Sequence, residues 1–285
     1  MPLDQFDVAP HGVSGAIAVA RQSEPRLGEP LSKVGRATIA ADGVSFDCGD
    51  EVRFELHGGE TIGWIPGPAW RGRLPVSFFS SMAAITLAWR GIVPLHASTV
   101  VLHGKAWLIA GSTGGGKSTV TAELLGAGAE LLADDLTPLA PGPEPHALPG
   151  RPAMRLHPES CDLIELTGPP EACDDGRGKL LARPRARAAD RAWPIGGIVL
   201  LGDALKPSTT ELDKALAYGT ILFRPKIVSA LPGRVRTRAG LLNLARSVPM
   251  ALVPAVRQFD AEARARRTDQ VLSAIEGLIS KRTAG

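Results

Sequence analysis

The chain has 285 residues, of which 44% are hydrophobic and 21% are charged, and its formal net charge is +3. A chain of this length and composition can build a sizeable core, which excludes a long disordered protein. The small net charge, without a basic stripe interleaved with aromatic residues, argues against nucleic acid as a partner.

The sequence shows no pattern typical of a segment that enters or crosses a membrane. Its apolar runs, such as residues 195–201, are far too short to span a bilayer. Residues 1–12 lack the basic and apolar regions of a signal peptide. The three cysteines have no metal-binding spacing and suit a reducing compartment. We therefore expect a cytoplasmic protein without a membrane partner.

The first third of the chain is predicted to be rich in strands. Residues 1–30 are polar and are expected to be loosely held. Over residues 34–75, short alternating runs are separated by glycine turns, which is typical of antiparallel strands. Residues 78–90 are predicted to form a helix that ends at Gly91. We expect a small strand-rich domain over residues 1–90 and a larger domain over residues 91–285.

The larger domain is predicted to be α/β. Two strands, at 97–102 and 106–110, form a hairpin that leads into a glycine-rich loop, followed by a helix at 117–125 and a strand at 129–133. Farther along we predict a loop (138–152), a helix (155–166), a charged and mobile stretch (171–191), a strand (195–201), helices (210–217 and 241–246), a strand (250–256) and an amphipathic helix (260–281). The expected fold is a P-loop mixed sheet with flanking helices, preceded by the small strand-rich domain.

The glycine-rich loop carries the strongest chemical signal. It fits the pattern G-x-x-x-x-G-K-[ST] without departure and consists of Gly111, Ser112, Thr113, Gly114, Gly115, Gly116, Lys117, Ser118 and Thr119. The glycines allow successive backbone N–H groups to point at phosphate oxygens, and the following helix adds the positive end of its dipole. Lys117 can place a cation on the phosphates, and the Ser118 hydroxyl can bind Mg²⁺. A glycine-rich turn without a ligand is the structural alternative.

Two adjacent acids form the second signal. Asp134 lies 17 residues after Lys117, and Asp135 follows it. A helix, a turn and a short strand return the chain to the edge of the sheet where the loop lies, because ligands sit at the carboxyl ends of strands in α/β sheets. One acid can hold Mg²⁺ and the other can accept the proton of an attacking hydroxyl. Without the loop, the pair could equally be turn residues or a helix cap.

His96 and a set of basic residues are weaker candidates. The hairpin places His96 either near the loop or one strand length away, and a structural role is the alternative. Downstream cations could neutralise phosphate or bind an acidic peptide end, or could form a solvated basic face. Arg155 is favoured because it follows the acid pair closely. The cations are Arg151, Arg155, Lys179, Arg183, Arg185 and Arg187.

Together these features resemble the core of the HPr kinase/phosphorylase family and its HPr-kinase-like relatives. The resemblance is specific over residues 91–140 and looser over 141–157. It is carried by a leucine–histidine pair before the hairpin, the loop, one helix and a strand that ends in two aspartates. The stretch reads LHASTVVLHGKAWLIAGSTGGGKSTVTAELLGAGAELLADD.

The resemblance implies a serine kinase that uses ATP and Mg²⁺, on a core related to phosphoenolpyruvate carboxykinase. By this likeness, Lys117 and the loop hold the triphosphate, and Ser118 takes part in metal binding. The Asp134–Asp135 pair supplies a general base and a metal contact, and His96 supports the base electrostatically.

The sequence departs from the bifunctional members of that family, which carry a longer glycine-rich signature downstream. Phosphorylase activity is therefore not favoured, and HPr itself is less favoured as the acceptor. Some smaller relatives phosphorylate the terminal serine of a lasso-peptide precursor, and the size and layout here are similar. The implied partner is a peptide or small protein bearing an acceptor serine, and the sequence is compatible with an oligomer.

Two other functions are compatible with the same loop. A small-molecule kinase could place an acid on the strand after it, although such chains usually begin with the loop and here more than 100 residues precede it. A non-catalytic nucleotide-binding regulator is the other alternative, and the absence of an Asn-Lys-x-Asp motif argues against GTP as its ligand.

Overall fold

The computed structural model describes residues 17–112, 114–140, 142–173, 176–202, 211–254 and 260–283. The chain divides into two compact units. The first unit contains residues 1–93 and 223–238, and the second contains residues 94–222 and 239–285. Residues 223–238 thus belong with the N-terminal part of the chain, whereas the division expected from the sequence places them in the larger domain.

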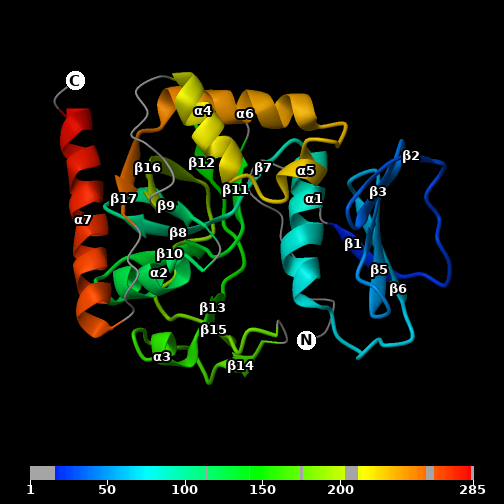
Figure 1. Ribbon diagram of the computed structural model, residues 1–285, viewed down its shortest axis with the longest axis horizontal. Coiled ribbons are helices and arrows are strands. Elements are labelled where there is room, and N and C mark those ends of the chain that lie inside the picture. The colour runs from blue at the N-terminus through cyan, green and yellow to red at the C-terminus, as the bar shows by residue number, and fades with distance from the viewer. Residues whose placement is uncertain are drawn as a thin grey trace. The chain divides into compact units, whose positions relative to one another are not determined.

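A six-stranded sheet forms the first unit together with short helices (Figure 1). The strands are β1 (Ala18–Arg21), β2 (Pro30–Val34), β3 (Ala37–Ala40), β4 (Gly43–Asp47), β5 (Val52–His57) and β6 (Thr61–Pro66), and the helices are η2 (Phe78–Met82), α1 (Ala83–Trp89) and α5 (Pro225–Val228). The antiparallel strands predicted over 34–75 are confirmed. However, β1 lies where loosely held chain was predicted, because it pairs in parallel with β6, about 40 residues away.

Within the described residues, a mixed sheet of eight strands is the centre of the second unit: seven lie on one path, and the eighth, β17, pairs with β16. Its strands are β7 (Val93–Leu95), β8 (Ala97–Leu102), β9 (Lys105–Gly111), β10 (Glu130–Ala133), β11 (Thr137–Ala140), β12 (His146–Ala147), β16 (Trp193–Leu201) and β17 (Met250–Val253). Strands β9, β16 and β17 are parallel, while β8 is antiparallel to both β9 and β10. The mixed α/β architecture predicted from the sequence is therefore confirmed.

Helices complete the second unit. They are α2 (Lys117–Gly126), α3 (Pro158–Cys161), α4 (Glu211–Thr220) and α7 (Ala261–Thr283), and α6 (Arg234–Ser247) runs from the first unit into the second. Helix α7 packs on β16, β17 and α2. Among the described residues, no helix combines the length and the hydrophobicity that crossing a bilayer requires.

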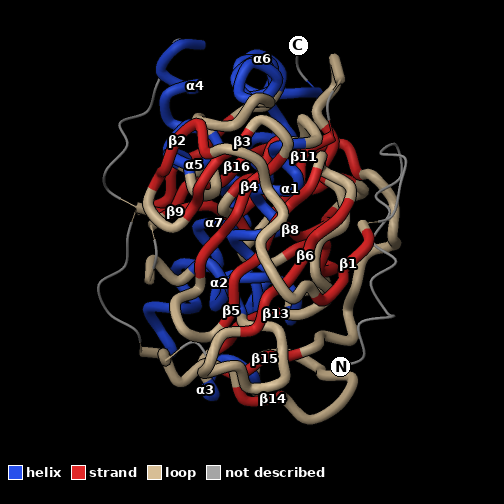
Figure 2. Tube along the Cα trace, turned by 90° about the vertical axis from the view of Figure 1, so that its right-hand side faces the viewer, coloured by secondary structure: helices blue, strands red, loops and turns tan. Residues whose placement is uncertain are grey.

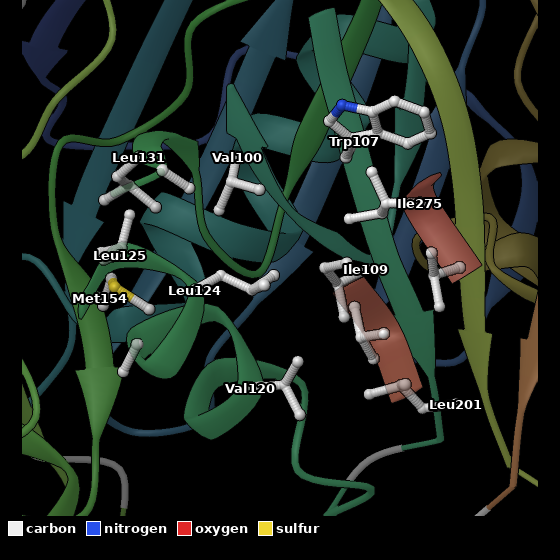
Figure 3. Packing of buried hydrophobic residues seen from close by; sticks show 14 of the residues in the cluster. Val100, Trp107, Ile109, Val120, Leu124, Leu125, Leu131, Met154, Leu201 and Ile275 are labelled. Carbon is white, nitrogen blue, oxygen red and sulfur yellow. The ribbon is translucent and has the colours of Figure 1, made fainter. Parts of the chain in front are cut away.

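A hydrophobic core cluster lies between the sheet, α2 and α7 (Figure 3). Alternate residues of β9, Trp107 and Ile109, point into it, as the two-residue period of a strand requires. Val120 and Leu124 enter from α2, and Ile275 enters from α7. Because α2 begins at the end of β9, this packing fixes the loop that joins them against the sheet.

A small sheet at one end of the second unit corrects two sequence predictions (Figure 2). Strands β13 (Met154–Leu156), β15 (Leu180–Ala182) and β14 (Glu171–Ala172) pair within stretches predicted as a helix and as mobile chain. The helix predicted over 155–166 is wrong except for the four-residue α3. Pro158 explains the break, since the residue before a proline avoids the helical region and proline suits the first helical turn. The loop predicted over 138–152 likewise contains the short β12 and the end of β11.

The bulge in β16 gives a test of core packing. The β9–β16 register shifts between Ile195 and Gly197, and a Cβ on Gly196 would lie 2.6 Å from Cζ2 of Trp107. Gly196→Ala should therefore lower the free energy of unfolding by about 1–3 kcal/mol, measured by urea denaturation. Gly277→Ala is the matched control, because its Cβ would meet nothing within 4 Å on α7. Gly277→Ala should raise the free energy of unfolding by about 0.5–1 kcal/mol, because alanine has the higher helix propensity. Equal changes in the free energy of unfolding for the two variants would contradict this account of the bulge.

Candidate functional site

The glycine-rich loop joins the end of β9 to the start of α2. Gly114 and Gly116 have φ of 80° and 79°, a left-handed region that favours glycine. At Gly111, an added Cβ would lie 2.5 Å from the carbonyl oxygen of Leu201 in β16. Glycine is thus required by backbone conformation at two positions and by close strand packing at the third. Thr113 lies outside the described residues.

The start of α2 has the electrostatics of an anion site. No acidic residue lies in the first turn of the helix, and the glycine at its N-cap offers no side chain to cap the N–H groups. The first N–H groups of a helix lack intrahelical partners, and the helix dipole adds positive potential there. This arrangement can bind phosphate oxygens.

Lys117 is folded back over the loop. It is 8% exposed, and its Nζ donates to the carbonyl oxygens of Gly111, at 2.9 Å, and Ser112, at 3.1 Å. Burial lowers the pKa of Lys117, whereas the negative charges of Asp135 and Asp134 act in the opposite direction. The ammonium group therefore lies on the loop and within electrostatic range of the acid pair.

Asp134 is buried at the end of β10 and accepts three hydrogen bonds. The hydroxyls of Ser98 and Ser118 donate to Oδ1, at 2.5 Å and 3.3 Å, and the backbone N–H of Arg155 donates to Oδ2 at 3.0 Å. Ser98 is adjacent because β8 pairs with β10. The structure thus brings together the loop serine and the first acid of the pair.

Asp135 has different surroundings. Its φ is 68°, and the N–H of Leu136 donates to the carbonyl oxygen of Asp134 at 2.8 Å, which closes a γ-turn around Asp135. A non-glycine residue in this region is strained, and such strain is concentrated at functional sites. Arg155 Nη2 lies 2.8 Å from Asp135 Oδ1, and the Asp135 side chain is 21% exposed. Asp135 is therefore the more accessible of the two acids.

His96, between β7 and β8, lies beside Asp135 rather than one strand length away. Its Nδ1 is 3.0 Å from the Asp135 carbonyl oxygen and 3.5 Å from Asp135 Oδ1. Burial lowers the pKa of His96, and the charge of Lys117 acts in the same direction, against that of Asp135. The neutral imidazole is favoured, so Nδ1 carries the proton that it donates to the carbonyl group.

Arg155 bridges the two acids from β13 rather than from the predicted helix. Its backbone N–H binds Asp134 while its guanidinium group binds Asp135. Lys179 lies close by, with Nζ 3.5 Å from the carbonyl oxygen of Arg155. Arg183 and Arg185 instead pair with Glu171 and Glu165.

Thr119 was also predicted to belong to the loop, but its side chain contacts α3. Its hydroxyl lies 3.4 Å from Oγ of Ser160, on α3.

Among the described residues, no group of three or more His, Cys, Asp or Glu side chains could hold a metal ion. The oxygen ligands at the site, Ser118 and the two aspartates, suit Mg²⁺, which needs few protein ligands when phosphate and water oxygens supply the rest.

Arg267 on α7 also reaches the loop, and the sequence analysis missed it. It is 5% exposed, and its Nη2 donates to the carbonyl oxygen of Gly115 at 2.5 Å. A signal was present in the sequence, because Arg267 falls at a four-residue spacing between Ala263 and Val271 on the apolar face of the predicted helix. A cation on a buried face needs a partner, and here the partner is the loop.

No family model matches the chain, and no curated protein matches it. One solved structure that it resembles is the Hpr(Ser) kinase/phosphatase from Coxiella burnetii, with 16% sequence identity and a TM-score of 0.27. The likeness covers 42% of this chain and 71% of that chain. A similarity at this level does not place the chain in that family.

Proposed function

We propose that the chain is an ATP- and Mg²⁺-dependent serine kinase, with an HPr kinase-like P-loop core, that acts on a peptide or small protein. One observation carries the proposal: the Ser118 hydroxyl, at the start of α2, lies 3.3 Å from the buried carboxylate of Asp134, beside the more accessible Asp135. A phosphate cradle, oxygen ligands for the metal and a carboxylate for the acceptor are the parts that phosphoryl transfer requires.

The loop residues have separate tasks in this proposal. Backbone N–H groups of the loop and of the first turn of α2 bind phosphate oxygens, and Lys117 moves from the carbonyl groups of Gly111 and Ser112 to the β- and γ-phosphates. Ser118 and Asp134 hold the metal ion, which when bound neutralises phosphate charge. Asp134 suits this task because its donors Ser98 and Arg155 N–H fix the carboxylate in place.

Asp135 is the proposed general base. It accepts the proton of the serine hydroxyl as the hydroxyl oxygen forms a bond to the γ-phosphorus, and the bond to the β–γ bridging oxygen breaks to release ADP. Arg155 and His96 orient the Asp135 carboxylate and backbone. The products are a phosphoserine and ADP, and the proton on Asp135 returns to solvent.

The cations beside the acid pair support an acceptor with an anionic group close to its hydroxyl. Lys179 contacts the backbone of Arg155, and the positive charges of both residues act to lower the pKa of Lys117. A peptide that ends in serine carries its own carboxylate two bonds from Cβ. This arrangement favours a C-terminal serine over an internal one.

The proposal is tested by incubating the protein with ATP, Mg²⁺ and a panel of acceptors, with mass spectrometry as the readout. The panel contains a peptide ending in serine, the same peptide with an amidated C-terminus, a peptide with an internal serine, an HPr-type protein, and free sugars and nucleosides. A gain of about 80 Da on a serine supports the kinase assignment, and loss of that gain on amidation supports the C-terminal preference.

The other outcomes identify the alternatives. Phosphorylation of a sugar or nucleoside alone would indicate a small-molecule kinase. ATP binding by calorimetry without transfer to any acceptor would indicate a nucleotide-binding regulator. The absence of ATP binding would overturn the proposal.

A further inference from the structure

Helix α7 presents a buried arginine to the glycine-rich loop. Helix α7 lies beside α2 (Figure 1). Its buried residues include Ala263, Val271 and Ile275. Arg267 lies in the same row and is 5% exposed. Burial of a guanidinium group is unfavourable unless its donors are satisfied, and a carboxylate is the common partner.

Arg267 binds a backbone carbonyl group instead of a carboxylate. Its Nη2 donates to Gly115, and within the described part of the chain its buried Nε has no hydrogen-bond partner. The acid of α2 that faces α7, Glu123, is bound by Thr268 and lies 3.7 Å from Arg264. The charge of Glu123 also acts on Arg267, where it opposes the lowering of the pKa by burial, although the hydrogen bond of Nη2 goes to Gly115.

The bond to Gly115 orients the next peptide group. A peptide unit is planar and trans, so the carbonyl group of Gly115 and the N–H of Gly116 point in opposite directions. Because Arg267 holds the carbonyl group on the α7 side, the N–H of Gly116 faces the other side of the loop. Gly116 also admits the guanidinium group, since an added Cβ would lie 2.5 Å from Arg267 Nη1.

We infer that Arg267 is a positioning residue for the anion site: it aligns the Gly116 N–H with the phosphate groups and so sets the affinity of the loop for a triphosphate. This inference rests on the proposed nucleotide binding by the loop. The guanidinium group also adds positive charge to the N-terminal end of α2, with the sign that an anion requires.

Two readouts separate positioning from a structural role. Affinity for ATP with Mg²⁺ is measured by calorimetry without an acceptor, and the backbone amide of Gly116 is followed by NMR without nucleotide. Arg267→Gln should weaken ATP binding about tenfold, raise KM for ATP to match and leave kcat within about twofold. It should also shift the Gly116 amide resonance and speed its hydrogen exchange. Arg267→Lys keeps a cationic donor and should recover part of the affinity.

Two controls complete the design. Arg266→Gln removes the neighbouring cation, whose side chain is 54% exposed and paired with Glu262, and should change neither readout. Thr268→Val removes the bond to Glu123 and should lower the melting temperature without weakening ATP binding. Melting curves of all variants confirm that each is folded at the assay temperature.

The outcomes are distinguishable. If the wild-type protein binds ATP and Arg267→Gln binds it equally well, Arg267 does not position the loop and the inference is overturned, while the proposed function stands. If the wild-type protein binds no ATP, the proposed function fails. A change at the Gly116 amide in Arg267→Gln would then still support positioning, and an unchanged amide would overturn it.

Discussion

Lys117→Ala is expected to lower kcat/KM for phosphoryl transfer by about a thousandfold or more and to leave the chain folded. The ammonium group lies on the loop, within electrostatic range of both aspartates. In the proposed reaction it neutralises the charge that develops on the transferring phosphoryl group. Removing one preorganised donor of this kind costs about 10²–10³ in rate, and removing its full charge as well costs more. Steady-state kinetics and melting curves measure the two effects.

Lys105→Ala is the matched control for Lys117→Ala. Lys105 begins β9 and Gly111 ends it, so Lys105 lies at the far end of the same strand from the loop. Its removal should leave kcat/KM unchanged. Substantial turnover by Lys117→Ala on the acceptor that the wild type modifies would contradict the role given to the loop.

Asp135→Asn is expected to lower kcat by about 10²–10⁴, with ATP affinity nearly unchanged. An amide cannot accept the proton of the acceptor hydroxyl at neutral pH, although it keeps the shape of the carboxylate. Single-turnover kinetics at saturating ATP and Mg²⁺ measure the chemical step directly. Asp162→Asn, at the exposed end of α3, is a control of the same chemical change and should have no effect.

Asp134→Asn should differ from Asp135→Asn in its metal dependence. Asparagine at position 134 can keep one oxygen toward the Arg155 N–H, but its NH₂ group then faces the hydroxyls of Ser98 and Ser118. We expect the Mg²⁺ concentration for half-maximal rate to rise about tenfold or more, because one charged ligand is lost. If both variants transfer phosphate at the wild-type rate, the two acids are turn residues.

The sequence by itself was sufficient to predict the local backbone structure around the glycine-rich loop. The strand, the glycine-rich loop and the helix from β9 to α2 are contiguous, so their sequence pattern carries the local conformation. The same holds for β16 and α7, which are long enough for their hydrophobic periods to be seen. Gly114 and Gly116 have positive φ values, a local backbone conformation that favours glycine and is therefore visible in the sequence.

Short elements that depend on distant partners could not be predicted in this way. β13 has three residues and exists by pairing with β15, about 25 residues later, so its own periodicity is too short to indicate a strand. β1 depends in the same way on β6. Segment 223–238 joins the first unit although it lies more than 120 residues after the rest of that unit in the chain.

Only the tertiary structure decided how the candidate residues are arranged. The sequence placed two aspartates after a strand, but strand pairing with β8 buries Asp134 under Ser98, while a γ-turn leaves Asp135 accessible. Likewise, the packing of α7 on α2 brings Arg267 to Gly115, across 152 residues of sequence. A loop's pattern is set by neighbours in the chain, whereas burial, hydrogen-bond partners and charge environment are set by residues that meet only when the sheet and helices pack.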